Sequence, residues 1–301
     1  MSEARRGTLF GVGAYLLWGL FPLFWPLLEP ARPLEVLSHR IVWSLLVVAV
    51  LVAVTSRRAA VLAVVRDRGK LWRLALAAVV VAVNWGTYIY GVTSGQVLET
   101  SLGYYINPLV TVLLGVLVLR ERLRPVQWVA LGVATLAVLV LTVENGRPPL
   151  LALVLACSFG AYGLLKKTAK VGAVEGLTVE TAVLAPVAAG YLLLLGAAGD
   201  ATAPSHGPGH LMLLAASGLV TAIPLLLFGG AATRIPLTML GILQFLAPTI
   251  QFLIGTLVQH EPVTPATLAG FLLVWAAVLI FSWDLLSEQR RVVALAVPEP
   301  V

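Results

Sequence analysis

The sequence predicts an all-α polytopic membrane protein with ten transmembrane helices, arranged as two inverted five-helix repeats with both termini in the cytoplasm. Three observations lead to this fold class. The chain is 59% hydrophobic and only 11% charged, whereas soluble domains are about 45–50% apolar and about 25% charged. Nearly the whole chain consists of apolar runs. Each run is close in length to the roughly 20 residues that a bilayer span needs. Landmarks of the first half also recur in the second half.

Polar residues, Pro and Gly divide the chain into ten apolar runs. The runs lie at 7–28, 34–55, 73–93, 100–119, 125–143, 149–166, 176–197, 211–232, 237–258 and 265–284. The first is of full span length and lacks a small-residue cleavage site, so we interpret it as a helix and not as a signal peptide. The tails 1–6 and 285–301 are short, and we expect them in the cytoplasm.

The basic residues support this count and orientation. All but three of the 20 Lys and Arg residues fall at the N-terminus or after an even-numbered span. They would share the cytoplasmic side if the N-terminus lies there. The exceptions are Arg32 and Arg147, in predicted outer loops, and Arg40 within the second span. The positive-inside rule therefore predicts that both termini are cytoplasmic.

A repeated stretch relates the two halves. The segment LGYYINPLVTVLLGVLVLRERLRP at 102–125 has a counterpart at 240–265. At a constant offset of 140, the matches are Pro108 with Pro248, Gly115 with Gly255, Glu121 with Glu261, and Pro125 with Pro265. The basic residues Arg120, Arg122 and Arg124 have no basic counterparts.

This loss of charge is expected if the second copy is inverted. An odd number of helices per half turns the second copy upside down in the bilayer, so corresponding loops should exchange charge. The basic segment after the second span corresponds to 198–210, which has no Lys or Arg. The predicted repeats are residues 7–143 and 149–284. Inverted repeats of this kind are typical of secondary transporters.

The second span carries the deepest charged side chain. Arg40 lies about 9 Å along the helix from Leu34, at 1.5 Å per residue. Its guanidinium either extends back to the outer surface or faces a cavity and binds a carboxylate or phosphate of a substrate. Glu35 and His39 share a face of the same helix, as a structural pair or a proton-sensing pair. Glu180, inside the seventh span, is a third candidate for coupling.

Polar and aromatic residues of other spans complete a candidate substrate site. Asn84 and Tyr88 share one helix face, which suits either a cavity wall or interhelical packing. Tyr15 and Trp18 lie midway along the first span, where anchoring at the membrane interface does not explain them. The full candidate set is Tyr15, Trp18, His39, Arg40, Asn84, Trp85, Tyr88, Tyr105, Asn107, Gln244 and Gln251.

Two prolines at matching positions predict helix bends. Pro108 and Pro248 each remove a helix hydrogen bond and leave a carbonyl without its donor at membrane depth. Paired bends around a binding site are one interpretation. Local satisfaction of the carbonyl by Asn107 is the other.

The sequence argues against other functional classes. Motifs of zinc proteases, nucleophile-elbow hydrolases and P-loop enzymes are missing, so we expect neither an enzyme nor a metal or other cofactor. The single cysteine, Cys157, excludes an internal disulfide. The net charge of +6 is explained by the basic residues of the predicted cytoplasmic loops. We therefore expect no nucleic-acid partner. The first span lacks an acid, which disfavours a pump for lipophilic cations and favours an anionic or zwitterionic substrate.

Several motifs carry a family resemblance over about residues 7–284. They are AYLLWGLFPLFW, LSHRIVWS, NW at Asn84-Trp85, LETSLGYYINPL, RERL from Arg120, FGAYGLLKK and LQFLAPT. The chain resembles the EamA family of the drug/metabolite transporter superfamily, in particular its RarD group; Arg120 stands where that family usually has Gly. The resemblance implies ten helices in two inverted EamA repeats, in the bacterial cytoplasmic membrane.

The resemblance also implies a permease for a small metabolite or drug-like solute, with the lipid bilayer as its other partner. A non-transporting membrane sensor or scaffold is the alternative, although the chain has almost no soluble part to serve as an output surface. The substrate, the direction of transport, the coupling ion and the choice between monomer and homodimer stay open.

Overall fold

The computed structural model describes residues 2–94, 97–145, 150–258 and 265–295. These ranges contain helices and no strands. The first half comprises α1 (Glu3–Gly19), α2 (Phe21–Phe24), the 3-10 helix η1 (Trp25–Leu28), α3 (Pro33–Val54), α4 (Arg58–Arg66), α5 (Arg68–Thr93), α6 (Val97–Leu117) and α7 (Pro125–Asn145). The second comprises α8 (Leu150–Ala169), α9 (Ala173–Ala197), α10 (Thr202–Ser205), α11 (Gly207–Ala232), α12 (Leu237–Leu243), α13 (Leu246–Leu257) and α14 (Pro265–Leu295).

Seven helical stretches in the described ranges are long and apolar enough to cross a membrane. They are Glu3–Leu28, Pro33–Val54, Arg68–Tyr88, Leu150–Ala169, Ala173–Ala197, Gly207–Ala232 and Leu237–Leu257. Shorter apolar helices, Gly103–Leu117, Pro125–Val140 and Leu268–Ile280, lie at the remaining predicted spans. An all-helical polytopic membrane protein is therefore confirmed, while ten crossings stay a prediction.

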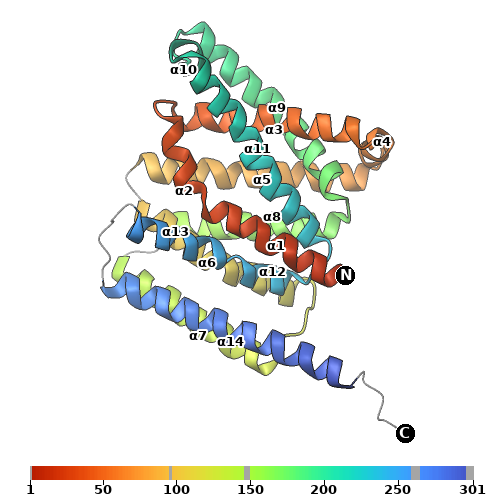
Figure 1. Cartoon of the computed structure of the whole chain (residues 1–301), viewed down its shortest axis with the longest axis vertical. Helices are drawn as coiled ribbons and strands as arrows, with labels where there is room; N and C mark the ends of the chain where they lie inside the picture. The colour runs from red at the N-terminus through yellow and green to blue at the C-terminus, as the bar shows by residue number, and fades with distance from the viewer. Residues whose placement is uncertain (1, 95–96, 146–149, 259–264, 296–301) are drawn as a thin grey trace.

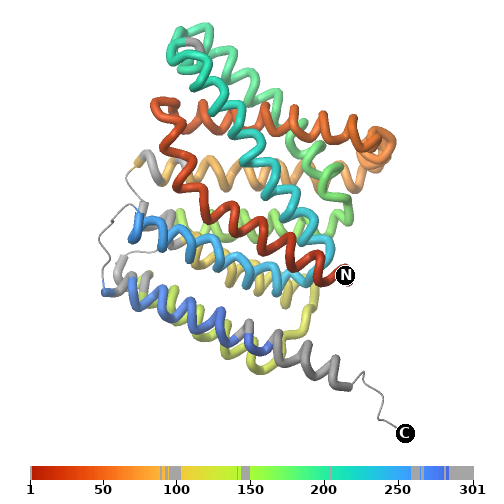
Figure 2. The backbone as a smooth tube through the Cα atoms, in the orientation of Figure 1, coloured from red at the N-terminus to blue at the C-terminus, as the bar shows by residue number. Residues whose placement is uncertain are grey.

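The helices lie side by side in one bundle (Figure 1). Helix α6 packs on α8 and α12, α5 on α8, α1 on α11 and α13, α3 on α9 and α11, and α7 on α14. The start of α1 and helix α4 lie on one side of the bundle, and α10 lies at the opposite side. The backbone trace in Figure 2 shows α7 and α14 as a pair along one edge.

Helix α4 is an element that the apolar runs did not predict. The segment RAAVLAVVR carries Arg at both ends and buries only Val64, against Leu74 of α5. Asp67 then ends α4 and receives the backbone N–H of Lys70 at 3.1 Å in the first turn of α5. This hydrogen bond lowers the pKa of the Asp67 carboxyl, because it stabilises the ionised form.

Small residues allow close helix crossings. A Cβ atom at Gly218 of α11 would lie 2.6 Å from the backbone carbonyl carbon of Trp43 in α3. Ser44 Oγ donates to the Gly218 carbonyl at 3.0 Å. Likewise, a Cβ atom at Gly241 of α12 would lie 3.0 Å from the Pro108 carbonyl oxygen of α6. Such contacts between small residues are a main source of helix association in membranes.

Candidate functional site

A cavity of about 180 Å³ lies inside the bundle. It is bounded by the first helical stretch, α3, α5, α6, α8, α11 and the junction of α12 with α13. Its polar and aromatic lining residues are Tyr15, Trp18, Phe21, Trp25, Arg40, Asn84, Trp85, Tyr88, Tyr104, Asn107, Phe159, Thr221, Gln244 and Gln251. Nine of the eleven residues proposed from the sequence are therefore brought to one cavity; His39 and Tyr105 are not among its lining.

Arg40 is the charged group of this cavity. Its Nε donates to Thr221 Oγ1 at 2.8 Å. Its guanidinium carbon lies 4.7 Å from the ring centroid of Trp25 and 5.1 Å from that of Trp85. No acidic side chain of the described residues forms an ion pair with it. Two aromatic rings and one hydroxyl thus hold the guanidinium in place without neutralising its charge.

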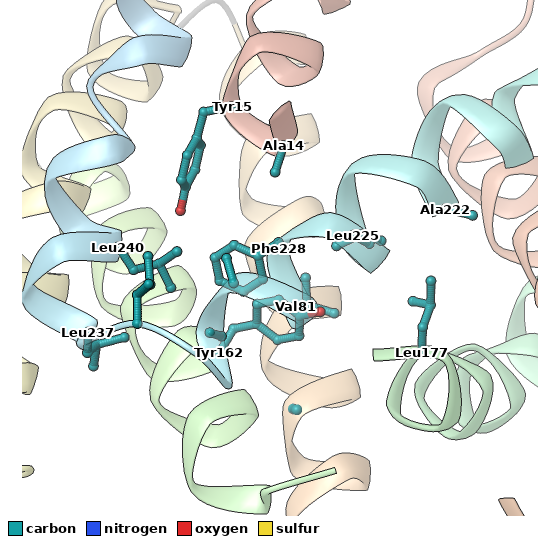
Figure 3. Close-up of a cluster of buried hydrophobic side chains, with 14 of the residues drawn as sticks. Ala14, Tyr15, Val81, Tyr162, Leu177, Ala222, Leu225, Phe228, Leu237 and Leu240 are labelled. Atoms are coloured by element: carbon teal, nitrogen blue, oxygen red, sulfur yellow. The ribbon is translucent and has the colours of Figure 1, made fainter. Parts of the chain in front are cut away.

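Aromatic side chains pack beside the cavity, next to its lining residues Tyr15 and Trp18. Tyr15, Tyr162 and Phe228 are each at most 2% exposed, and Figure 3 shows them gathered between the helices. The rings of Tyr162 and Phe228 stack at 5.5 Å. Trp18 lies 5.6 Å from Phe228 and 5.7 Å from Phe159.

Two polar atoms in the cavity wall lack partners. The Tyr15 hydroxyl and Asn107 Oδ1 are buried, with no hydrogen bond to any described residue. Leaving such an atom unsatisfied costs about 1–3 kcal/mol. Water or a bound solute in the cavity would provide the missing partners.

Proline explains the broken helices beside the cavity. Pro248 has no N–H for the carbonyl of Gln244, and the chain breaks between α12 and α13 at this point. Pro22 likewise leaves the Trp18 carbonyl without its helical donor, and Gln251 Nε2 donates to that carbonyl at 3.1 Å. Pro108, in contrast, lies inside the continuous helix α6.

The structure differs from the sequence prediction at Tyr105. Its ring packs on Phe271 at 5.0 Å in a separate apolar cluster. Tyr104 lines the cavity instead, 6.0 Å from the ring of Tyr88. Successive helical side chains point about 100° apart, since a turn holds 3.6 residues. Tyr104 therefore faces the cavity, while Tyr105 faces Phe271 of α14.

His39 and Glu35 also have other partners than those expected. His39 Nδ1 accepts from Trp43 Nε1 at 3.2 Å. Glu35 is fully buried, and its Oε1 accepts from the backbone N–H and the hydroxyl of Thr202 at 2.8 and 2.9 Å. The same hydroxyl lies 2.9 Å from His210 Nε2. Glu35 therefore ties the N-terminal end of α3 to α10 and does not hydrogen-bond to His39.

Asn84 combines the two roles that its sequence position left open. It lines the cavity, yet its Nδ2 donates to the Leu155 carbonyl at 2.8 Å and to Ser158 Oγ at 3.0 Å on α8. The amide nitrogen therefore serves interhelical packing.

Glu180 lies in a buried network. Its carboxylate contacts Lys166 Nζ at 2.7 Å and accepts from the Tyr162 hydroxyl at 3.0 Å. Lys166, which the distribution of basic residues predicts in the cytoplasmic loop after the sixth span, is instead 5% exposed inside α8. Its buried partner on α9 explains why a lysine is tolerated there.

Trp25, Tyr104 and Thr221 are cavity residues that sequence reasoning missed. Trp25 follows Pro22 at the end of the first stretch, a place where a tryptophan usually indicates the membrane interface. Thr221 is one of two hydroxyl residues, with Ser217, in an otherwise apolar run. In the described part of the chain, no group of three or more His, Cys, Asp or Glu side chains is arranged to hold a metal ion.

Known proteins match this chain over nearly its whole length. The EamA-like transporter family matches residues 5–143. Protein RarD of Streptomyces exfoliatus is 54% identical, covering 96% of this chain and 92% of its own. An uncharacterized transporter, YojE, of Bacillus subtilis (strain 168) is 42% identical, covering 96% and 97%.

The chain belongs to the EamA-like transporter family, in its RarD group. It is therefore a multi-pass protein of the bacterial cytoplasmic membrane and a membrane transporter of the drug/metabolite kind. A solved crystal structure of a protein also superposes with a TM-score of 0.68 at 20% identity, covering 91% of this chain and 96% of the other. That likeness supports the fold alone.

Proposed function

We propose that this chain is a secondary-active permease that moves a small anionic or zwitterionic solute by alternating access between two inverted repeats. The observation that carries the substrate class is Arg40, a cation in the cavity wall without an acidic partner among the described residues. A charge in that position is costly. A substrate carboxylate or phosphate would offset this cost through charge-assisted hydrogen bonds to the remaining guanidinium N–H groups.

The cavity also limits the size and shape of the solute. Its volume of about 180 Å³ corresponds to about six water molecules at roughly 30 Å³ each. Trp18, Trp25, Trp85 and Tyr88 supply flat apolar walls. Asn107 and the Tyr15 hydroxyl supply unpartnered polar atoms. A small solute with one anionic end and an apolar body fits these groups.

Helix contacts support the inverted repeats, residues 7–143 and 149–284. In the proposed repeats, α1 corresponds to α8, α3 to α9, α5 to α11, α6 to α12 with α13, and α7 to α14. Exchanging the two halves therefore converts the contact of α5 with α8 into that of α11 with α1. It converts the contact of α6 with α8 into that of α12 and α13 with α1. All of these pairs are in contact. The pairs α3–α9, α6–α12 and α7–α14 convert into themselves and are in contact too. An N-in, C-in arrangement of ten spans fits this exchange.

In alternating access, each end of the cavity must open in turn. At one end the cavity residue Tyr15 packs on Phe228, which stacks on Tyr162, and we expect this cluster to separate when that end opens. Beyond them, Glu121 of the first half accepts the backbone N–H groups of Leu237 and Thr238 of the second half, both at 2.8 Å. Moving the repeats apart at this end would separate these contacts and connect the cavity to the cytoplasm.

Proton coupling through Glu180, Glu35 and His39 is a further part of the proposal. Glu180 is buried within the network of Lys166 and Tyr162. Glu35 Oε2 is buried without a partner in the described part of the chain, and His39 lies one turn further along α3. Transport rates that do not change when the pH gradient is collapsed would exclude this part.

The experiment is a counterflow screen in proteoliposomes with labelled amino acids, organic acids and lipophilic cations. We expect exchange of at least one anionic or zwitterionic solute. Exchange confined to cations would contradict the proposed substrate class. No exchange of any solute would favour a sensor or scaffold.

A further inference from the structure

A second cavity, of about 740 Å³, lies apart from the candidate substrate site. It is formed by the start of α1, Arg57 just after α3, the end of α8, the start of α9 and the last turns of α11. Its charged lining residues are Glu3, Arg57, Lys167, Lys170 and Arg234, and its larger apolar ones are Phe10, Val171, Val174, Ile223, Leu226 and Leu227.

The two arginines of this cavity are held in place but retain donors. Arg57 Nη1 contacts Glu175 Oε1 at 2.8 Å. Arg234 uses Nε for Glu3 at 2.9 Å and Nη1 for the Gly230 carbonyl at 2.9 Å. No contact with a described residue engages the Nη2 of either arginine. These pairs orient the guanidinium groups and leave N–H donors for a ligand.

The lysines differ from each other. Lys167 Nζ donates to the Ile235 carbonyl at 2.6 Å and lies 3.8 Å from Glu121. Lys170 forms no hydrogen bond or ion pair with any described residue. Three carboxylates lie near these basic side chains, those of Glu3, Glu121 and Glu175, and Glu3 also pairs with Arg6 at 3.3 Å. Basic side chains therefore outnumber carboxylates here, and the net positive charge favours an anionic ligand.

Part of the apolar wall lies along α11, away from the charged helix ends. From Gly230 back to Ile223, α11 extends about 10 Å at 1.5 Å per residue, and Ile223 is 46% exposed. The cavity therefore combines charged groups at the helix ends with an apolar wall along α11 that reaches the surface of the bundle. A soluble anion would gain no free energy from contact with such an apolar wall, whereas an acyl chain would bury apolar surface against it.

We propose that this cavity binds an anionic phospholipid. Its headgroup phosphate accepts from Lys170, Arg57 and Arg234, and one acyl chain lies along Ile223, Leu226 and Leu227. Basic pockets between helix ends at the membrane surface commonly take such headgroups. The site shares no lining residue with the Arg40 cavity, so it can be tested independently of transport.

The test is native mass spectrometry of the purified full chain, titrated with phosphatidylglycerol and with phosphatidylcholine of the same acyl chains. We expect preferential retention of phosphatidylglycerol. Lys170→Gln should weaken it about five-fold, the effect of one basic residue near the surface. Lys70→Gln is the matched control, because Lys70 lies outside the cavity, 3.4 Å from Asp67, and should change nothing.

Two further arms separate a lipid from a free anion. Inorganic phosphate in excess should not displace phosphatidylglycerol, and Ile223→Ser, on the exposed wall, should weaken lipid retention. Equal retention of the two lipids, equal effects of the two lysine substitutions, or displacement by phosphate would each overturn the proposal.

Discussion

At the scale of single residues, the pair Lys166–Glu180 places two charges where almost no solvent reaches. Breaking a buried pair from one side leaves an uncompensated charge, at a cost of about 3–5 kcal/mol. We therefore expect Lys166→Met to destabilise the protein strongly, and Lys166→Met combined with Glu180→Leu to restore much of the loss. Equilibrium unfolding in mixed micelles measures both. A double variant less stable than the single one would contradict this account.

Gly218 provides a second test at this scale. A methyl group there would collide with the backbone of Trp43, and overpacking costs about 1–3 kcal/mol. Gly218→Ala should therefore lower the melting temperature in detergent. Gly190→Ala is the matched control, since nothing lies within 4 Å of a Cβ atom at Gly190 of α9. Equal melting temperatures for both variants would show that α3 and α11 do not cross as closely as described.

The sequence predicts which types of residue line the site, but it does not show towards which neighbour each side chain points. Arg40, Asn84 and Gln244 stood out because polar groups are costly in a bilayer. Tyr105 was chosen over Tyr104 because the sequence does not reveal which face of an almost wholly apolar helix is turned inward. The partners of Asn84 and Glu35 come from other helices, which the spacing along one helix cannot show.

At the scale of elements, Glu121 caps a helix of the other half. Its carboxylate accepts two N–H groups at the start of α12, where the helix dipole also favours negative charge. Glu121→Gln should cost about 0.5–2 kcal/mol, as for loss of other caps, and speed amide exchange at Leu237 and Thr238.

Hydrogen-exchange mass spectrometry measures this effect. Glu29→Gln is the control, because Glu29 is exposed and its side chain forms no hydrogen bond or ion pair with a described residue. Unchanged exchange at Leu237 and Thr238 in Glu121→Gln would show that the cap does not stabilise α12. The predicted counterpart, Glu261, lies outside the described residues.

The apolar runs predict the positions of the main helices, since each predicted span overlaps a helix. Two features of the structure could not be predicted from the apolar runs. Helix α4 is too short and too basic to form a span, and its single buried residue depends on α5 and α9. The breaks in the first and ninth spans occur near Pro22 and Pro248. The freed Trp18 carbonyl accepts from Gln251, and the freed Gln244 carbonyl accepts from the backbone N–H of Ala247, whereas α6 keeps Pro108 in a continuous helix. Proline alone does not distinguish these outcomes.

At the scale of the whole molecule, the charge asymmetry predicts which side faces the cytoplasm. In a Cys157→Ser background, His206→Cys should react with a membrane-impermeant maleimide in intact cells. Arg68→Cys should react only after permeabilisation. Both positions are exposed. His206 follows α10 and Arg68 begins α5 just after α4, and α10 and α4 lie on opposite sides of the bundle in Figure 1. The reverse labelling pattern would contradict the proposed N-in, C-in orientation.

We propose that the uncompensated charge of Arg40 binds the transported solute. The direct measurement compares Arg40→Ala with Arg32→Ala in counterflow of the solute found by the screen. Arg32 is an exposed arginine at the start of the same helix, paired with Asp200 at 3.4 Å. Removing one partner of a buried charge pair costs about 2–5 kcal/mol. We therefore expect Arg40→Ala to lower exchange at least about thirty-fold and Arg32→Ala to leave it unchanged. Wild-type exchange by a correctly inserted Arg40→Ala protein would contradict the account.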